Sequence, residues 1–271
     1  MKDILSCPVC GNPLYTKERT YCCAGNHSFD IARQGYVNLL CGKSGTVHGD
    51  NALMIAARRR FLSGGYYAPL ADALTKLLQK HIKGQPTLLD IGCGEGYYTE
   101  AAFQAIHPLD GKIYAFDISK DALKATAQRK GASLFVASAY KIPVLDASVD
   151  AVTLFFSPLA REEILRVLKE NGIFIMAYPG EKHLWGLKQA IYDTPYLNTP
   201  ESNEIEGFLL LEKQDISEEI FLPSNQAVMD LFAMTPYYYK TSERDHAKLA
   251  SLPSLTTDIS FHLCVYKKII P

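Results

Sequence analysis

Residues 88–98, with the sequence LLDIGCGEGYY, decide the fold of this chain. An apolar run ends in an aspartate, breaks into alternating glycines and gives way to helix-forming residues. This is the pattern of a buried strand that turns through a tight loop into a helix. Such a loop requires glycine where a nucleotide lies almost against the backbone, because a Cβ would collide with it there. The stretch therefore predicts a ligand-binding turn.

The spacing and the charge of this turn indicate its ligand. A pyrophosphate-binding dinucleotide site prefers Gly-x-Gly-x-x-Gly, whereas Gly92, Gly94 and Gly96 follow Gly-x-Gly-x-Gly, with Asp90 two residues ahead. Glu95, at the mouth of the next helix, would repel a phosphate and suits a cationic or neutral ligand. We therefore predict that these five residues hold S-adenosylmethionine, a nucleoside with an amino acid and a sulfonium but no phosphate.

The surrounding sequence, from residue 87 to residue 193, alternates between strand and helix patterns. This alternation predicts a parallel sheet with helices on both faces, in which a nucleoside binds at the carboxyl ends of the strands. Asp117 closes an apolar run, so we expect its carboxylate to bind the ribose hydroxyls, while Ser119 can cap the next helix. The predicted strands span residues 87–92, 112–118, 133–137, 150–156 and 172–178, and the predicted helices span 97–107, 120–130, 160–169 and 181–193.

Length and composition limit the classes of protein to which this chain can belong. Its 271 residues, 48% of them apolar, suffice for one large domain and a small one. No apolar run reaches the ~18 residues of a membrane span, and no hydrophobic signal core follows the first residues. We therefore expect a cytoplasmic protein without a membrane partner. Its formal net charge of −1 excludes a globally polycationic nucleic-acid binder.

A cysteine-rich segment stands near the start of the chain. Cys7 and Cys10 form one knuckle, and Cys23 and His27 follow with the Cys-x-x-x-His spacing of a second. Three thiolates and one imidazole can hold zinc in a tetrahedron with no open position, so the predicted ion is structural. Cys22 lies beside Cys23 and could take its place as a ligand.

A basic helix is predicted between this module and the glycine turn. Asp50 is a candidate N-cap, and Arg58, Arg59 and Arg60 fan around the polar side, where they are candidates for contact with RNA phosphates. Residues 1–60 hold eight basic and four acidic side chains, out of 28 and 29 in the whole chain, so the positive charge gathers at this end. The predicted domains are a zinc-binding module at 1–40, a linker with a connecting helix at 41–68, and a methyltransferase domain at 69–271.

The acceptor side of the predicted site is less sharply marked. Residues 155–158, Phe-Phe-Ser-Pro, are expected at its mouth, where neither the Asn-Pro-Pro-Tyr of exocyclic-amine methylation nor a Pro-Cys nucleophile occurs. The absence of both favours a ring nitrogen or an oxygen as methyl acceptor. Further strands are expected at 209–211, 219–222 and 259–266, with a helix at 225–233 between them.

Four motifs together resemble a known family. Cys-Pro-x-Cys with Cys-x-x-x-His, Gly-Tyr-Val-Asn-Leu-Leu, Ala-Arg-Arg-x-Phe-Leu-x-x-Gly-x-Tyr-x-Pro-Leu and Leu-Asp-Ile-Gly-Cys-Gly-Glu-Gly are similar to the bacterial 23S rRNA guanine-N1 methyltransferases of the RlmA type. The resemblance implies a Rossmann-like class I methyltransferase domain with a zinc-bound N-terminal domain for RNA recognition. It also implies methylation of a guanine in a hairpin of the large-subunit rRNA.

The resemblance also assigns individual positions. It makes Cys7, Cys10, Cys23 and His27 the zinc ligands, and it adds Tyr67 and His183 to the cofactor-contacting residues. By sequence alone, His183 is rather a histidine on a helix face. No residue is assigned as the catalytic base, and a homodimer flanking one RNA stem-loop is a further expectation. The alternatives are a small-molecule methyltransferase of the same fold and a zinc-bearing RNA-binding factor with a vestigial cofactor site.

Overall fold

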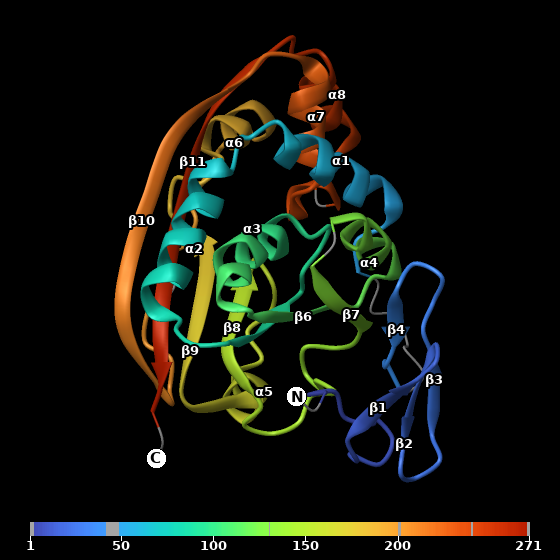
Figure 1. The fold of residues 1–271 in the computed structure, drawn as a ribbon. Coiled ribbons are helices and arrows are strands. Elements are labelled where there is room, and N and C mark those ends of the chain that lie inside the picture. Colours follow the sequence, from blue (N-terminus) through green and yellow to red (C-terminus); the bar gives the residue numbers. More distant parts are fainter. Residues whose placement is uncertain (1–2, 42–48, 130, 200–201, 240, 270–271) are drawn as a thin grey trace.

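The computed structural model describes residues 3–41, 49–129, 131–199, 202–239 and 241–269. This part of the chain forms two sheets, with the helices packed around the larger one (Figure 1). The strands are β1 (Leu14–Lys17), β2 (Thr20–Cys23), β3 (Ser28–Asp30), β4 (Tyr36–Asn38), β5 (Thr87–Ile91), β6 (Lys112–Asp117), β7 (Ala132–Val136), β8 (Val149–Phe155), β9 (Leu168–Pro179), β10 (Phe208–Leu222) and β11 (Leu255–Lys268). The α-helices are α1 (Ala52–Ser63), α2 (Ala68–His81), α3 (Tyr97–Ile106), α4 (Lys120–Thr126), α5 (Arg161–Val167), α6 (Trp185–Ile191), α7 (Asn225–Ala233) and α8 (Glu243–Ala250), with 3-10 turns at His107–Leu109, Ala127–Arg129 and Pro236–Tyr239.

The large sheet has the strand order β10-β11-β9-β8-β5-β6-β7-β4. The strands from β9 to β4 run parallel, and β11 and β10 are antiparallel to their neighbours. From β5 the chain builds outward through β6 and β7, then returns to add β8 and β9 on the other side. The glycine turn follows β5, which is the position where this order reverses and where an open parallel sheet forms a binding crevice.

The predicted strands and helices of residues 87–193 are confirmed, with ends that shift by a few residues. All five residues of β5 are buried, as its continuous apolar pattern predicts. Ser119 caps α4 by accepting the amide of Ala122 at 3.2 Å, also as predicted. The cap predicted for α1 is wrong by one residue: Asn51 accepts the amide of Met54, while Asp50 forms an ion pair with Arg58.

The C-terminal strands are longer than the sequence indicates. The two strands predicted at 209–211 and 219–222 are parts of one strand, β10, which pairs with β11 along almost its whole length. A register shift between Leu210 and Glu212 marks a bulge in this pair. The long two-stranded ribbon curves along one side of the molecule in Figure 1, in orange and red, and α7 lies in the connection between its strands as predicted.

Different elements cover the two faces of the large sheet. Helices α2, α3, α6 and α7 pack on one face, around buried residues such as Leu74, Leu187 and Phe232. On the other face, buried Leu5 and Leu14 of the N-terminal module join the same hydrophobic cluster as residues of β5, β6 and α5. The expectation of helices on both faces is therefore only partly met, because the N-terminal module takes the place that a helix would occupy.

The N-terminal module is joined to the sheet by main-chain pairing as well. Strands β1, β2 and β3 form a separate small sheet, but β4 pairs with β7 as the outermost strand of the large one (Figure 1). A bridge between Leu5 and Val144 adds a second attachment. The described residues contain no helix long and apolar enough to cross a membrane.

Candidate functional site

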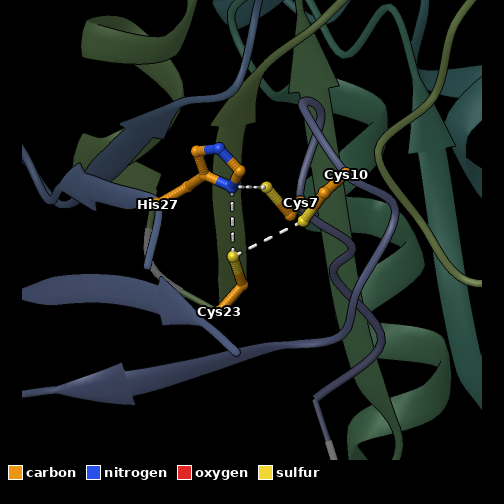
Figure 2. Close-up of side chains that lie close together, drawn as sticks. All are labelled: Cys7, Cys10, Cys23 and His27. Atoms are coloured by element: carbon orange, nitrogen blue, oxygen red, sulfur yellow. Dashed lines mark hydrogen bonds between the residues drawn. The ribbon is translucent and has the colours of Figure 1, made fainter. Parts of the chain in front are cut away.

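Three cysteines and one histidine meet at the base of the small sheet (Figure 2). Cys7 and Cys10 lie in the turn before β1, Cys23 ends β2, and His27 precedes β3. The Nδ1 of His27 lies 3.6 Å from the Sγ of Cys7 and 3.4 Å from the Sγ of Cys23. The Sγ atoms of Cys10 and Cys23 are 3.6 Å apart.

These spacings fit a zinc tetrahedron. With metal bonds of about 2.3 Å to sulfur and about 2.0 Å to nitrogen, the edges of a tetrahedron are about 3.8 Å between sulfurs and about 3.5 Å between sulfur and nitrogen. Burial raises the pKa of the Cys23 thiol, but hydrogen bonds from His27 outweigh this and lower it to about 6. The cluster uses Cys23 and leaves out Cys22, which settles the alternative left by the sequence.

The three glycines of the turn all have positive φ, but their surroundings differ. A Cβ on Gly92 would lie 2.3 Å from the Oγ of Ser157, and one on Gly96 would lie 2.7 Å from Thr126. Among the described residues, a Cβ on Gly94 would meet only the guanidinium of Arg58, at 3.4 Å. Gly92 and Gly96 therefore allow protein segments to pack closely, whereas Gly94 is bordered by one charged side chain at ordinary contact distance.

Asp90 braces the turn from below. Only 2% of it is exposed, and its two oxygens accept hydrogen bonds from Thr99 at 2.5 Å and Thr153 at 2.8 Å. Burial raises the pKa of this carboxyl to about 6, and the two hydroxyls counteract part of that effect. Asp90 thus ties β5 to α3 and β8, and its oxygens already have partners within the protein.

Glu95 is buried as well, and it is paired with an arginine. Arg129 donates to its carboxylate at 2.7 Å and also pairs with Glu100. Burial is the main cause that raises the pKa of Glu95, with Arg129 opposing it. The Oε1 atom of Glu95 has no hydrogen-bond partner among the described residues. The negative charge predicted at the helix mouth is thus present but largely compensated.

Asp117 lies at the carboxyl end of β6, beside the turn. Its carboxylate accepts the amide of Gly94 at 3.0 Å and the amide of Ser119 at 2.8 Å. Each oxygen keeps a lone pair for a further donor. Burial raises the pKa of this carboxyl, and the two backbone hydrogen bonds oppose that effect.

Tyr67 and His183 meet although 116 residues separate them, with the tyrosine hydroxyl 3.4 Å from Nε2. The Ser260 amide donates to Nδ1 at 3.3 Å, which fixes the proton of the neutral ring on Nε2. Burial lowers the pKa of His183 to about 3, so the ring is neutral. Its Nδ1 lone pair accepts a hydrogen bond and burial lowers its pKa, so His183 is a poor proton acceptor.

The three arginines of α1 point to three different partners. Arg58 pairs with Asp50 above the glycine turn, Arg59 donates to Gln128 at 2.5 Å, and Arg60 pairs with Asp230 at 2.6 Å. Arg60 is about half exposed and Arg58 only about a quarter. The three side chains do not form one basic surface. Only Arg59 and Arg60 remain candidates for contact with a polyanion.

Two aromatic residues lie at the mouth of the site: Phe156 belongs to the stretch 155–158 that the sequence predicts there, whereas the sequence does not single out Tyr98 as a functional residue. Tyr98 stacks on Phe155, and its buried hydroxyl has no hydrogen-bond partner among the described residues. Phe156 is 47% exposed and has a φ of 56°, a backbone conformation that bulky residues rarely adopt. A strained, exposed aromatic beside a ligand turn points to a functional role.

The site as a whole fits S-adenosylmethionine. Only the Arg58 side chain borders Gly94 among the described residues, and Asp117 offers acceptors to ribose hydroxyls. The buried Glu95 Oε1 and Tyr98 hydroxyl have no hydrogen-bond partner in the described part of the chain and can take one from a ligand. Asp117 has no ion-pair partner among the described residues, and its carboxylate suits a ligand of net positive charge.

Comparison with known proteins gives two family matches. Residues 5–44 match the RlmA N-terminal zinc-ribbon family, and residues 89–176 match the methyltransferase domain family. The first segment contains the whole Cys/His cluster and β4, and the second begins in β5 and ends in β9.

Three curated relatives cover most of the chain. The 23S rRNA (guanine(748)-N(1))-methyltransferase of Streptomyces fradiae is 34% identical over 69% of this chain and 67% of its own. A protein of Micromonospora griseorubida is 37% identical over 66% of this chain and 67% of its own. YxjB of Bacillus subtilis is 30% identical over 95% of both chains. The Micromonospora and Bacillus proteins carry the name 23S rRNA (guanine-N(1)-)-methyltransferase as a provisional assignment.

Proposed function

We propose, from the premise that this chain belongs to the family of 23S rRNA (guanine-N1)-methyltransferases, that it transfers a methyl group from S-adenosylmethionine to N1 of a guanine in 23S rRNA. The observation that carries the proposal is the glycine turn beside Asp117, bordered at Gly94 by a side chain and not by packed backbone, in a chain that also holds a zinc-type Cys/His cluster. A small-molecule methyltransferase would have no use for that module.

In this proposal the cofactor is held by residues from several elements. Gly92, Gly94 and Gly96 shape the turn, Asp117 binds the ribose hydroxyls, and Glu95 offers its free oxygen to a donor. Tyr67 and His183 line the site with buried, uncharged side chains that exclude water. We assign Asp90 to holding the turn in place, since both of its oxygens are engaged by threonines.

S-adenosylmethionine would supply an electrophilic methyl carbon. The protein must align the acceptor nitrogen with it and exclude water. Guanine N1 carries a proton and is hidden by base pairing, so the base must be unpaired or flipped out. The released proton goes to a group other than His183, which is a poor proton acceptor. Phe156, exposed at the carboxyl end of β8, is suited to stack on the base.

The zinc module is proposed to bind the RNA, and the ion to be structural. Arg59 and Arg60, on the outward side of α1, remain candidates for phosphate contacts, and a hairpin is the expected form of the substrate. We also propose a cytoplasmic location, because ribosomal RNA is found there.

We further propose that two copies associate. Leu209, Leu210 and Leu211 are exposed on β10, the outermost strand of the large sheet, and a second copy would cover them. Light scattering after size-exclusion chromatography measures the mass directly, and a monomer at high concentration would contradict this part of the proposal.

Transfer of a tritiated methyl group to unmodified large-subunit rRNA tests the main proposal. We expect incorporation that maps to N1 of a guanine by nuclease digestion and mass spectrometry. Saturable cofactor binding without incorporation would favour a small-molecule methyltransferase, and an absence of cofactor binding would favour an RNA-binding factor.

A further inference from the structure

We propose that Arg58 binds the α-carboxylate of S-adenosylmethionine, in a subsite above Gly94 that Asp50 helps to build. The inference rests on the proposed function, because it concerns the same cofactor, but it names a ligand for the amino-acid end that the glycine turn alone does not provide. It also removes Arg58 from the candidate RNA contacts.

The position of Arg58 is the first argument. Its Nη1 lies 3.4 Å from the point that a Cβ of Gly94 would occupy, so the guanidinium stands directly beside the middle glycine of the turn. Its side chain is 24% exposed, which is less than half the exposure of Arg60 on the same helix. An arginine that serves RNA phosphates would point outward, whereas this one faces the cofactor turn.

The backbone before α1 holds this arrangement in place. The main-chain oxygen of Asp50 accepts the hydroxyl of Ser119 at 2.7 Å, which ties it to the loop that follows Asp117. A Cβ on Gly49 would lie 2.9 Å from Ile118 and Ser119, so the chain passes close to that loop. Asp50 thus lies beside the loop that follows the proposed ribose ligand, and its partner Arg58 lies beside the glycine turn, where we place the amino-acid end of the cofactor.

The charges around Arg58 are the second argument. Asp50, Glu95 and Asp117 bring three carboxylates to the site, and Arg129 is already taken by Glu95 and Glu100. The ligand carries two positive charges, on the sulfonium and the ammonium, and one negative charge, on its carboxylate. The carboxylate needs a cation within this acidic surrounding, and Arg58 supplies one.

Arg58 also has donors to spare. A guanidinium has five N–H donors in a planar fork that matches a carboxylate. Among the described residues, its polar partners are Asp50, in the ion pair, and the main-chain oxygen of Met234, which accepts a long hydrogen bond of 3.5 Å from Nη2. We assign Asp50 to positioning the guanidinium, while the remaining N–H groups bind the cofactor carboxylate.

Calorimetric titration of the full-length protein with two nucleosides tests the assignment. S-adenosylhomocysteine carries the carboxylate, and 5′-methylthioadenosine lacks the whole amino-acid end. We expect Arg58→Met to weaken binding of S-adenosylhomocysteine by about 10- to 100-fold, as for the loss of a charged hydrogen bond. Its affinity for 5′-methylthioadenosine should stay within about twofold of the wild type. Arg58→Lys, which keeps the charge without the planar fork, should lose less.

The matched control is Arg59→Met, because Arg59 is the next residue of the same helix but contacts Gln128. Circular dichroism verifies that all variants are folded. Equal losses for both nucleosides in Arg58→Met, or equal losses in the Arg58 and Arg59 variants, would overturn the assignment while leaving the proposed function intact. A wild-type protein that binds neither nucleoside would overturn the proposed function and the subsite together.

Discussion

Replacing Asp90 by asparagine should change how the stability of this protein depends on pH. The carboxyl is buried between Thr99 and Thr153, and its pKa is raised from 3.8 to about 6, chiefly by burial. The folded state therefore holds this proton more tightly than the unfolded chain. The stability that the protonated group contributes is fully present below about pH 4 and is lost as the pH rises through about 6.

The size of this effect follows from the two pKa values. The difference between 3.8 and about 6 corresponds to about 3 kcal/mol over the whole range, as an upper estimate. Between about pH 5 and about pH 7.5 it amounts to about 1 kcal/mol. Asparagine is isosteric and does not titrate here, so the Asp90→Asn variant should lack this component.

Urea denaturation at several pH values measures the difference in the free energy of unfolding between variant and wild type. We expect the variant to gain about 1 kcal/mol relative to the wild type as the pH rises over that interval. Taking the difference cancels titrations common to both proteins, including those of the zinc ligands. Asp150→Asn is the control, because Asp150 lies on neighbouring β8 but is partly exposed and paired with Lys169. A difference that does not vary with pH would refute the reasoning.

Three further predictions concern the turn, the metal and the acceptor side. Gly92→Ala should lower the free energy of unfolding, measured by urea denaturation, by about 3 kcal/mol, because the new Cβ meets Ser157. Gly94→Ala should lower it by only about 1–2 kcal/mol, the cost of an alanine at positive φ, and equal losses would contradict the packing argument. Cys10→Ser should lower both the zinc content, measured by mass spectrometry, and RNA methylation, while the affinity for the cofactor is retained. Loss of cofactor affinity as well would show that the zinc module and the cofactor site do not act separately. Phe156→Gly should raise the KM for RNA about tenfold or more in methyl-transfer kinetics without weakening cofactor binding, and an unchanged KM would exclude stacking.

Much of the fold could be predicted because its signals are local. The buried run of β5, the glycines after it and the Ser119 cap are all patterns within a few residues. The cap of α1 was missed by one position because Asp50 and Asn51 are both good capping residues, and only the three-dimensional partner of Asp50 decides between them. Strand β10 was divided in the prediction because its middle is polar, as expected where a strand faces solvent.

The candidate site was predictable to a smaller extent. The Cys/His cluster has a spacing typical of zinc sites, but the spacing alone leaves Cys22 as an alternative to Cys23, and only the folded chain shows which of the two joins the cluster. The positions of Arg58 and Tyr98 depend on how α1 and α3 pack over the turn, and no local pattern records that. Family likeness names Tyr67 and His183 only as separate cofactor contacts, and their meeting joins two segments that are distant in the sequence. The tautomer of His183 depends on the amide of Ser260.

The pairing of β4 with β7 bears on how this protein can be dissected. A shortened chain that starts at residue 69 would leave β7 with a bare row of backbone donors and acceptors. It would also strip Leu5 and Leu14 from one face of the sheet, leaving that apolar surface open to water. Unprotected sheet edges of this kind recruit other chains into aggregates. A catalytic fragment made for crystallography or screening should therefore retain the first forty residues, or carry a substitute strand and new polar side chains on that face.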